Sequence, residues 1–260
     1  MASSDICFNC EKHWLCDYVK DFLEPEHKVY NENILLKRRH SLLVADHMLK
    51  LADYLKLNEH DRSLAGVIGL FHDIGRFKQY RDFKTFSDRE SLYHGDLGIQ
   101  VLEETGKLDE FSPSTASLMK TAIHNHGLPA IEYGLNEREL QFSMMIRDAD
   151  KMDIYRIVDA YYKEMLTGKR NISLELGLNN EDKISPYIME QFMNEKTIMK
   201  SDMNYLNDFK LLQIAWIYDL NYAYTQRYVR ESGYLDSIID SITVPDVKEK
   251  IRRKVNSFLV

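Results

Sequence analysis

Apolar side chains recur every three or four residues along almost the entire chain, which is the spacing of one face of an α-helix. Alternation of apolar and polar residues, the pattern of a half-buried strand, is almost absent. The 260 residues include only 11 glycines and 5 prolines, too few for a collagen, a low-complexity polymer or a glycine-rich β-sandwich. No internal repeat and no linker of biased composition interrupts the pattern. The sequence therefore predicts an all-α fold, a single helical bundle over residues 1–260.

Start and stop signals place the boundaries of the expected helices. Ser112 is a good N-cap and is followed by a proline, while Gly168 and Gly233 each end a long apolar stripe. The predicted helices cover residues 11–23, 33–56, 60–73, 89–104, 113–126, 137–166, 186–195, 205–231 and 245–258. The stretch 168–184, which is rich in glycine and asparagine, is the clearest predicted loop.

Charge and composition narrow the classes of partner. Acidic residues outnumber basic ones by 41 to 34, for a formal net charge of −7. A general binder of double-stranded nucleic acid or of anionic lipid needs an excess of Lys and Arg, so neither partner is expected. The N-terminal segment lacks the apolar core of a signal peptide, and no apolar run approaches the roughly 20 residues of a membrane span. With three cysteines and no disulfide framework, the expected compartment is the reducing cytoplasm.

The three cysteines Cys7, Cys10 and Cys16 lie close together, with His13 between the last two. A Cys-x2-Cys pair suggests zinc. However, no hairpin or loop separates these residues so that they could close a tetrahedron around an ion. The favoured interpretation is a frayed terminus with incidental thiols.

The placement of histidine and aspartate is the most informative feature. His72-Asp73 directly follows a run of apolar residues, where an acid is rarely buried unless it is paired or binds a metal. His40 and His126 lie on the inward stripes of their helices, and Asp150 shares a face with isoleucines. Taken alone, each of these residues is more typical of a core position whose polar atoms are hydrogen-bonded. Several of them on separate helices of one bundle can compensate one another around a shared ion.

The order His40, then His72-Asp73, then Asp150 resembles the H…HD…D signature of the HD-domain superfamily of metal-dependent phosphohydrolases. The neighbouring segments are similar to those of the family. They read LFHDIGRF at residues 70–77, HGDLG at 94–98, AIHNH at 122–126 and RDADKMD at 147–153. The resemblance covers residues 14–160, and the C-terminal packing part, residues 182–260, matches only loosely. It implies the helical-bundle fold of an HD domain.

The resemblance also implies a metal site. The implied ligands are His40, His72, Asp73 and Asp150. Two imidazoles and two carboxylates leave open positions in an octahedral shell, which suits Mn, Fe, Co or Ni, with Mg also considered, better than a closed zinc site. Such an ion acidifies a bound water that can attack phosphorus, and Asp73 is the implied catalytic base. His94 and His126 match positions that hold a second metal in some members and contact phosphate in others, so one or two ions are expected.

Polar residues beside these motifs are candidates for binding the substrate. Arg76, also a candidate catalytic residue, can grip a phosphate with its guanidinium, and its alternative role is a surface charge. Lys151 can do the same or pair with Asp148, which in turn can orient a ligand. His124 is expected at the rim of the site. The segment 77–92 is interpreted as a solvated connection, with a lid over the substrate as the alternative.

Three functions remain open from the sequence. The first is a metal-dependent phosphohydrolase that cleaves a phosphate ester or anhydride of a small molecule such as a nucleotide. The second is a di-iron oxygenase, which ligands of this kind also permit, and the third is a non-enzymatic module that senses nucleotides. The expected partners are a small phosphorylated substrate and further copies of the chain in a homo-oligomer.

Overall fold

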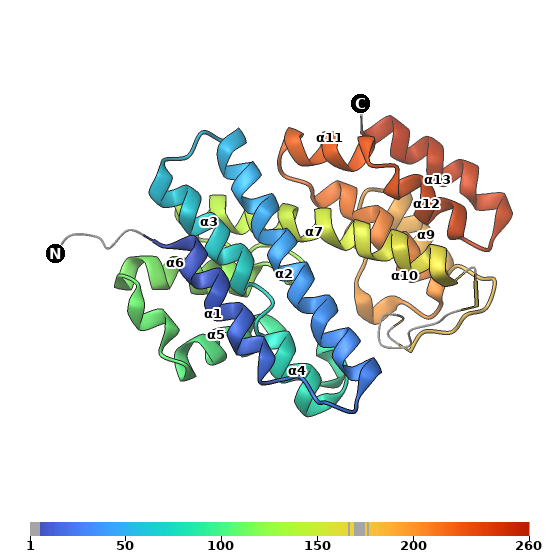
Figure 1. The fold of residues 1–260 in the computed structure, drawn as a ribbon. Coiled ribbons are helices and arrows are strands. Elements are labelled where there is room, and N and C mark those ends of the chain that lie inside the picture. Colours follow the sequence, from blue (N-terminus) through green and yellow to red (C-terminus); the bar gives the residue numbers. More distant parts are fainter. Residues whose placement is uncertain (1–5, 166, 169–174, 176, 260) are drawn as a thin grey trace. The chain divides into compact units, whose positions relative to one another are not determined.

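The chain folds into helices joined by turns, as the computed structural model shows for residues 6–165, 167, 168, 175 and 177–259 (Figure 1). Within these residues the only strand-like pairing is an isolated bridge between Asn179 and Tyr205, so the predicted all-α class is confirmed. No helix in this part of the chain is long and apolar enough to cross a membrane. Two compact units are formed, Met1–Asp150 and Lys151–Val260, and their boundary falls inside one long helix. The interpretation of residues 1–260 as one domain stays a prediction.

The first unit contains six complete helices and the beginning of a seventh within the described residues. They are α1 (Phe8–Lys20), α2 (Lys28–Tyr54), α3 (Glu59–Phe71), α4 (Gly75–Phe83), α5 (His94–Glu104), α6 (Pro113–Asn125) and the start of α7 (Glu137–Met165), with the 3-10 turns η1 (Asp88–Glu90) and η2 (Lys107–Glu110). α3 packs along α2 and also contacts α1, while α5 packs against α4 and α6. The core of the unit therefore lies between α2 and α3 and extends to α5.

Local signals explain where several of these helices begin. The side chain of Asn58 accepts a hydrogen bond from the backbone N–H of Asp61 at 2.9 Å and so caps α3. Ser112 caps α6 in the same way, with Pro113 in the first turn, as the sequence predicts. These caps fix the starts of the two helices whose C-cap residues are His72 and His126.

α2 and α3 approach most closely at a glycine. A Cβ atom added to Gly69 would lie 2.6 Å from the Cα atom of Ala45 and 2.9 Å from its backbone nitrogen. Real Cβ atoms do not come this close to backbone, so only glycine permits this crossing. The crossing brings the C-terminal end of α3 to the middle of α2.

The first half of the segment 77–92 is helical and partly buried, so its interpretation as a solvated connection is wrong there, and the lid stays a prediction. Residues up to Phe83 belong to α4, and Phe77 is fully buried. Tyr80 and Phe86 are also buried, and their rings stack with centroids 4.5 Å apart. Burial of these aromatic side chains outweighs the solvation of the charged residues between them. The predicted helix 89–104 accordingly starts later, at the first residue of α5.

The N-terminal cysteines also differ from expectation. Cys7 and Cys10 form a disulfide, and Cys16 is free and half-buried. Cys7 is the N-cap of α1, where its sulfur accepts a hydrogen bond from the N–H of Cys10. A frayed terminus with incidental thiols is therefore wrong for these residues, and the bonded sulfurs are not zinc ligands.

The second unit is built around a core of aliphatic and aromatic side chains. Its elements are the end of α7, α9 (Pro186–Met193), η3 (Lys200–Asp202), α10 (Leu206–Ala215), η4 (Trp216–Asp219), α11 (Ala223–Glu231), α12 (Tyr234–Ser241) and α13 (Pro245–Phe258). Tyr155 and Tyr162 of α7 are fully buried in this core and donate hydrogen bonds to Gln213 of α10. α13 has the predicted boundaries. The predicted loop 168–184 lies partly outside the described residues, as does the last residue of the predicted helix 137–166.

The predicted helix 205–231 is wrong as a single element. α10 ends at Ala215, η4 follows, and the backbone is extended at Leu220 and Tyr222 before α11 begins. No glycine or proline marks this break in the sequence. Leu220 and Ile217 are buried in the core of the unit, so tertiary packing overrides the continuous helical stripe.

Candidate metal centre

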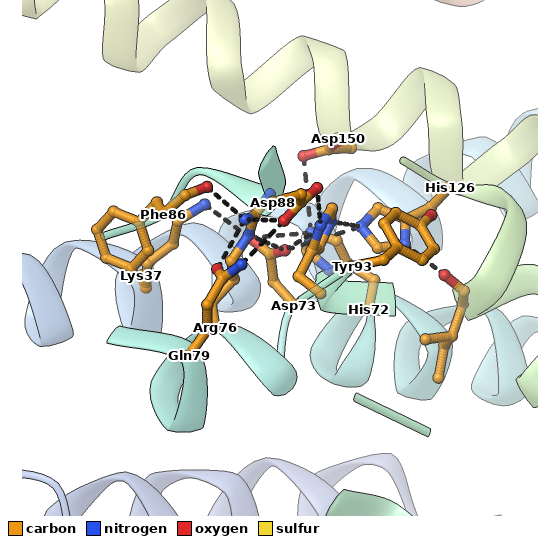
Figure 2. Close-up of polar contacts among 12 residues, drawn as sticks. Lys37, His72, Asp73, Arg76, Gln79, Phe86, Asp88, Tyr93, His126 and Asp150 are labelled. Atoms are coloured by element: carbon orange, nitrogen blue, oxygen red, sulfur yellow. Dashed lines mark hydrogen bonds and ion pairs between the residues drawn. The ribbon is translucent and has the colours of Figure 1, made fainter. Parts of the chain in front are cut away.

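Six of the predicted site residues converge inside the first unit, four of which are labelled in Figure 2 (His72, Asp73, His126 and Asp150). They are His40 from α2, His72 and Asp73 at the end of α3, His94 at the start of α5, His126 at the end of α6 and Asp150 from α7. His40 and Asp150 lie inside helices, and the other four lie at a helix end or within two residues of one. All but Asp150, whose side chain is 16% exposed, are buried.

Four of these residues form a first cluster. His40 Nε2 lies 3.0 Å from Asp150 Oδ1 and 3.5 Å from Asp73 Oδ2. His72 Nε2 lies 3.2 Å from His40 Nε2 and 3.6 Å from Asp150 Oδ1. One ligand atom each from His40, His72 and Asp150 can be chosen so that all lie within 4.8 Å of one another, a spacing that could hold one ion. The structure thus brings together the four residues that the sequence predicts as metal ligands.

A second cluster lies on the other side of Asp73. His94 Nε2 and His126 Nε2 are 2.8 Å apart. They lie 3.5 Å and 3.7 Å from Asp73 Oδ1. The Asp73 carboxylate therefore turns Oδ2 toward one pair of imidazoles and Oδ1 toward the other, and it joins the two clusters.

Hydrogen bonds fix the tautomers of three of the imidazoles. His72 Nδ1 is 2.8 Å from the carbonyl oxygen of Gly69, and His126 Nδ1 is 2.5 Å from that of Ile123. A carbonyl can only accept, so these Nδ1 atoms carry the protons. His94 Nδ1 lies 2.8 Å from Asp88 Oδ2 and donates in the same way. The Nε2 lone pairs are left to face the clusters, which is the arrangement of metal-bound histidines.

The charge states also suit a cation. Burial lowers the pKa of His72, and burial together with the positive charge of Arg76 lowers the pKa of His94 to about 3. Burial alone would raise the pKa of both carboxyls, but Lys37 beside Asp73 and the hydrogen bond from His40 to Asp150 outweigh it. Both carboxyl pKa values therefore lie well below the ordinary value. Neutral imidazoles and ionised carboxylates are the forms that bind metals.

Two cations contact Asp73, and one of them was not identified from the sequence. Lys37 donates from Nζ to Asp73 Oδ2 at 2.7 Å, and its side chain is only 16% exposed. Lys37 precedes His40 by three positions and shares its helix face, which is the signal that could have found it. Arg76 donates from Nε to Asp73 Oδ1 at 3.3 Å. It is buried rather than a surface charge, and its role in binding substrate stays a prediction.

Arg76 and the residues around it form a hydrogen-bond network next to the second cluster. Arg76 Nη1 donates to Asp88 Oδ1 at 2.8 Å, to Gln79 Oε1 at 2.8 Å and to the carbonyl oxygen of Phe86 at 2.6 Å. Asp88, in η1, links this network to His94. Figure 2 shows its contacts with Arg76 and Gln79. The sequence marks neither Asp88 nor Gln79, because their partners lie on other elements.

Hydrogen bonds from a side chain of α7 hold the turn that carries His126. Arg147 donates from Nη1 to the carbonyl oxygens of Asn125 at 2.9 Å and Leu128 at 2.6 Å. Gly127 in the same turn lies against His94, since an added Cβ would be 2.7 Å from the Cε1 atom of that ring. α7 therefore supplies Asp150 and also holds the turn that places His126.

The remaining predicted site residues belong to neither cluster. His124 is 30% exposed at its side chain and pairs with Asp96 and Glu132, as expected for a residue at the rim. Lys151 begins the second unit, where its ammonium lies 2.7 Å from Asp219. Asp148 is fully buried. Substrate-binding roles for His124 and Lys151 stay predictions.

Comparison with known proteins assigns the region that holds the site. Residues 38–156 match the family model described as the HD domain. The match includes all six clustered histidines and aspartates and leaves out Lys37. Searches of curated proteins and of solved structures gave no match to the chain.

Proposed function

Residues 38–156 are an HD domain, and on this premise we propose that the chain is a metal-dependent phosphohydrolase acting on a small phosphate ester or anhydride, such as a nucleotide. The observation that carries the proposal is the Asp73 carboxylate, which faces the His40–His72 pair with one oxygen and the His94–His126 pair with the other. Buried acids and imidazoles gathered from separate helices in this way are typical of a metal site.

The donor set fits a divalent transition metal. His40, His72, Asp73 and Asp150 would hold a first ion, and His94 and His126 with Asp73 Oδ1 would hold a second. Mixed nitrogen and oxygen ligands favour Mn, Fe, Co or Ni, and Mg is the weaker candidate because of the imidazoles. When bound, such an ion supplies an acidified water and neutralises charge on a phosphate oxygen.

Residues of the chain would orient the reactants. Asp73 is proposed to accept a hydrogen bond from the attacking water, since its low pKa makes it an acceptor rather than a store of protons. Lys37, at 2.7 Å from the same carboxylate, brings a positive charge beside the proposed position of the phosphate. Asp73 is buried and the side chain of Lys37 is only 16% exposed. Limited contact with water strengthens the electrostatic interactions of both groups.

Replacing Lys37 with methionine tests this arrangement. Lys37→Met is expected to raise KM for the substrate by about 10- to 100-fold, because a charge-assisted hydrogen bond is worth about 1.5–3 kcal/mol. Metal affinity should not fall, because an ammonium that competes for Asp73 Oδ2 is removed. Steady-state kinetics and equilibrium dialysis measure the two effects. Lys28→Met, on the exposed start of the same helix, is the control and should change neither value. An unchanged KM in Lys37→Met would exclude this role.

The function itself is tested by metal dependence. Protein stripped with a chelator should release no phosphate from a panel of nucleotides and sugar phosphates, and adding Mn²⁺ should restore release. The double variant His72→Ala/Asp73→Ala measures the background. If the Mn²⁺-loaded protein does not exceed this background on any substrate, the proposal is wrong. Oxygen uptake by the iron-loaded protein would favour the oxygenase instead, and tight nucleotide binding without turnover would favour a sensor.

A further inference from the structure

Asp88 divides its two carboxylate oxygens between different partners. Oδ2 accepts the hydrogen bond from His94 Nδ1 at 2.8 Å. Oδ1 accepts from Arg76 Nη1 at 2.8 Å and from Gln79 Nε2 at 2.9 Å. The residue lies in η1, between α4 and α5, and its side chain is 24% exposed. One carboxylate thus joins the first turn of α5 to two side chains of α4.

The two donors on Oδ1 are themselves fixed in orientation. Arg76 Nη1 also donates to Gln79 Oε1 and to the carbonyl oxygen of Phe86. Gln79 Nε2 also donates to Ser91 Oγ at 2.8 Å and to the carbonyl oxygen of Leu92 at 2.9 Å. Neither donor can be exchanged for an acceptor without breaking several bonds at once, so the Oδ1 position of residue 88 must be an acceptor.

We infer that Asp88 is a positioning residue that selects the tautomer of His94. By accepting from Nδ1, it keeps the Nε2 lone pair of His94 directed at His126 and Asp73. An imidazole protonated at Nε2 instead would turn a proton into the second cluster and could not donate its lone pair to an ion there. The consequence for metal binding rests on the proposed function, whereas the choice of tautomer does not.

An asparagine at this position should reverse the tautomer while keeping the shape of the side chain. In Asp88→Asn, the donors Arg76 and Gln79 hold the amide oxygen at the Oδ1 position. The amide nitrogen then occupies the Oδ2 position and directs an N–H donor at His94 Nδ1. Nδ1 must become an acceptor, and the proton moves to Nε2.

Nitrogen-15 NMR of the histidine side chains in the metal-free protein reports this directly. His94 is expected to be protonated at Nδ1 in the wild type and unprotonated at Nδ1 in Asp88→Asn, with its signals assigned through His94→Gln. Asp82→Asn, an exposed acid at the end of α4 that pairs with Arg81, is the control and should leave the spectrum of His94 unchanged. A wild-type His94 without a proton on Nδ1 would overturn the inference, and so would a spectrum that Asp88→Asn does not alter.

Metal binding supplies the second readout. Asp88→Asn should weaken binding of Mn²⁺ to the second cluster by about 10- to 100-fold, the usual effect of removing the partner of a ligand histidine. Binding at the first cluster should be retained, because Asp88 forms its hydrogen bonds with His94, Arg76 and Gln79. Reversal of the tautomer without weaker binding would sustain the positioning role and contradict the proposed second ion. Unchanged tautomers together with weaker binding would overturn the inference and leave the proposed function standing.

Discussion

Replacing Asp73 with asparagine is expected to lower the rate of phosphate release by about a thousandfold or more, because the lost ligand charge removes several kcal/mol of stabilisation from the reacting phosphate. The Asp73 carboxylate faces both pairs of imidazoles, with Oδ2 toward His40 and Oδ1 toward His94 and His126. This carboxylate also balances the buried charges of Lys37 and Arg76. An asparagine has the same shape but no charge. The bound metal ions and the side chains of Lys37 and Arg76 would then lose the carboxylate that they share.

The rate and the metal content of purified Asp73→Asn measure this effect together. Asp53→Asn removes a carboxylate of the same unit that is 57% exposed and pairs with Arg62, and it should retain full activity and full metal content. A variant of Asp73 that still binds metal and turns over substrate near the wild-type rate would show that Asp73 is not at the centre of the reaction.

Replacing Gly69 with alanine is expected to lower the free energy of unfolding by about 3 kcal/mol, the upper part of the range for overpacking a core. The new Cβ would lie 2.6 Å from the Cα atom of Ala45, and backbone cannot rotate away as a flexible side chain can. The helices α2 and α3 would have to separate. The carbonyl oxygen of Gly69 also accepts the hydrogen bond from His72 Nδ1. Separation of the two helices should therefore also disturb the arrangement of the first cluster.

Chemical denaturation monitored by circular dichroism measures the loss of stability in Gly69→Ala. Gly98→Ala is the matched control, since its added Cβ would meet the nearest heavy atoms at 3.4 Å, an ordinary contact. Alanine is also a better helix former than glycine, so Gly98→Ala should leave stability unchanged or raise it by up to about 1 kcal/mol. Equal stability of the two variants would contradict the close crossing of α2 and α3.

Helices with explicit local signals could be predicted from the sequence, and those defined by packing could not. Ser112 and Pro113 mark the start of α6 by their own chemistry, and the structure begins the helix there. The break after Ala215 has no such mark, because it depends on which faces of α10 and α11 are buried. The sequence did not predict α4 for a related reason. Its many charged residues obscure the apolar pattern of the buried Phe77 and Tyr80.

The same distinction applies to the site. The inward positions of His40 and His126 follow from helical periodicity, and the adjacency of His72 and Asp73 is visible in the sequence. The contact between Lys37 and Asp73 joins residues 36 positions apart. The link from Asp88 to Arg76 likewise depends on how the chain returns after α4. No period or spacing encodes these pairings, so only the folded structure identifies them.

Because Arg147 holds the turn of His126 in place, the positions of the two clusters depend on each other. Arg147 lies one helical turn before Asp150, so a shift of this part of α7 displaces an acid of one cluster and an imidazole of the other in the same movement. Loss of a metal ion from either cluster would then increase the mobility of the other cluster as well. Amide exchange at residues 125–129 should consequently rise when the protein is stripped of metal, although this turn contributes a single imidazole to the site.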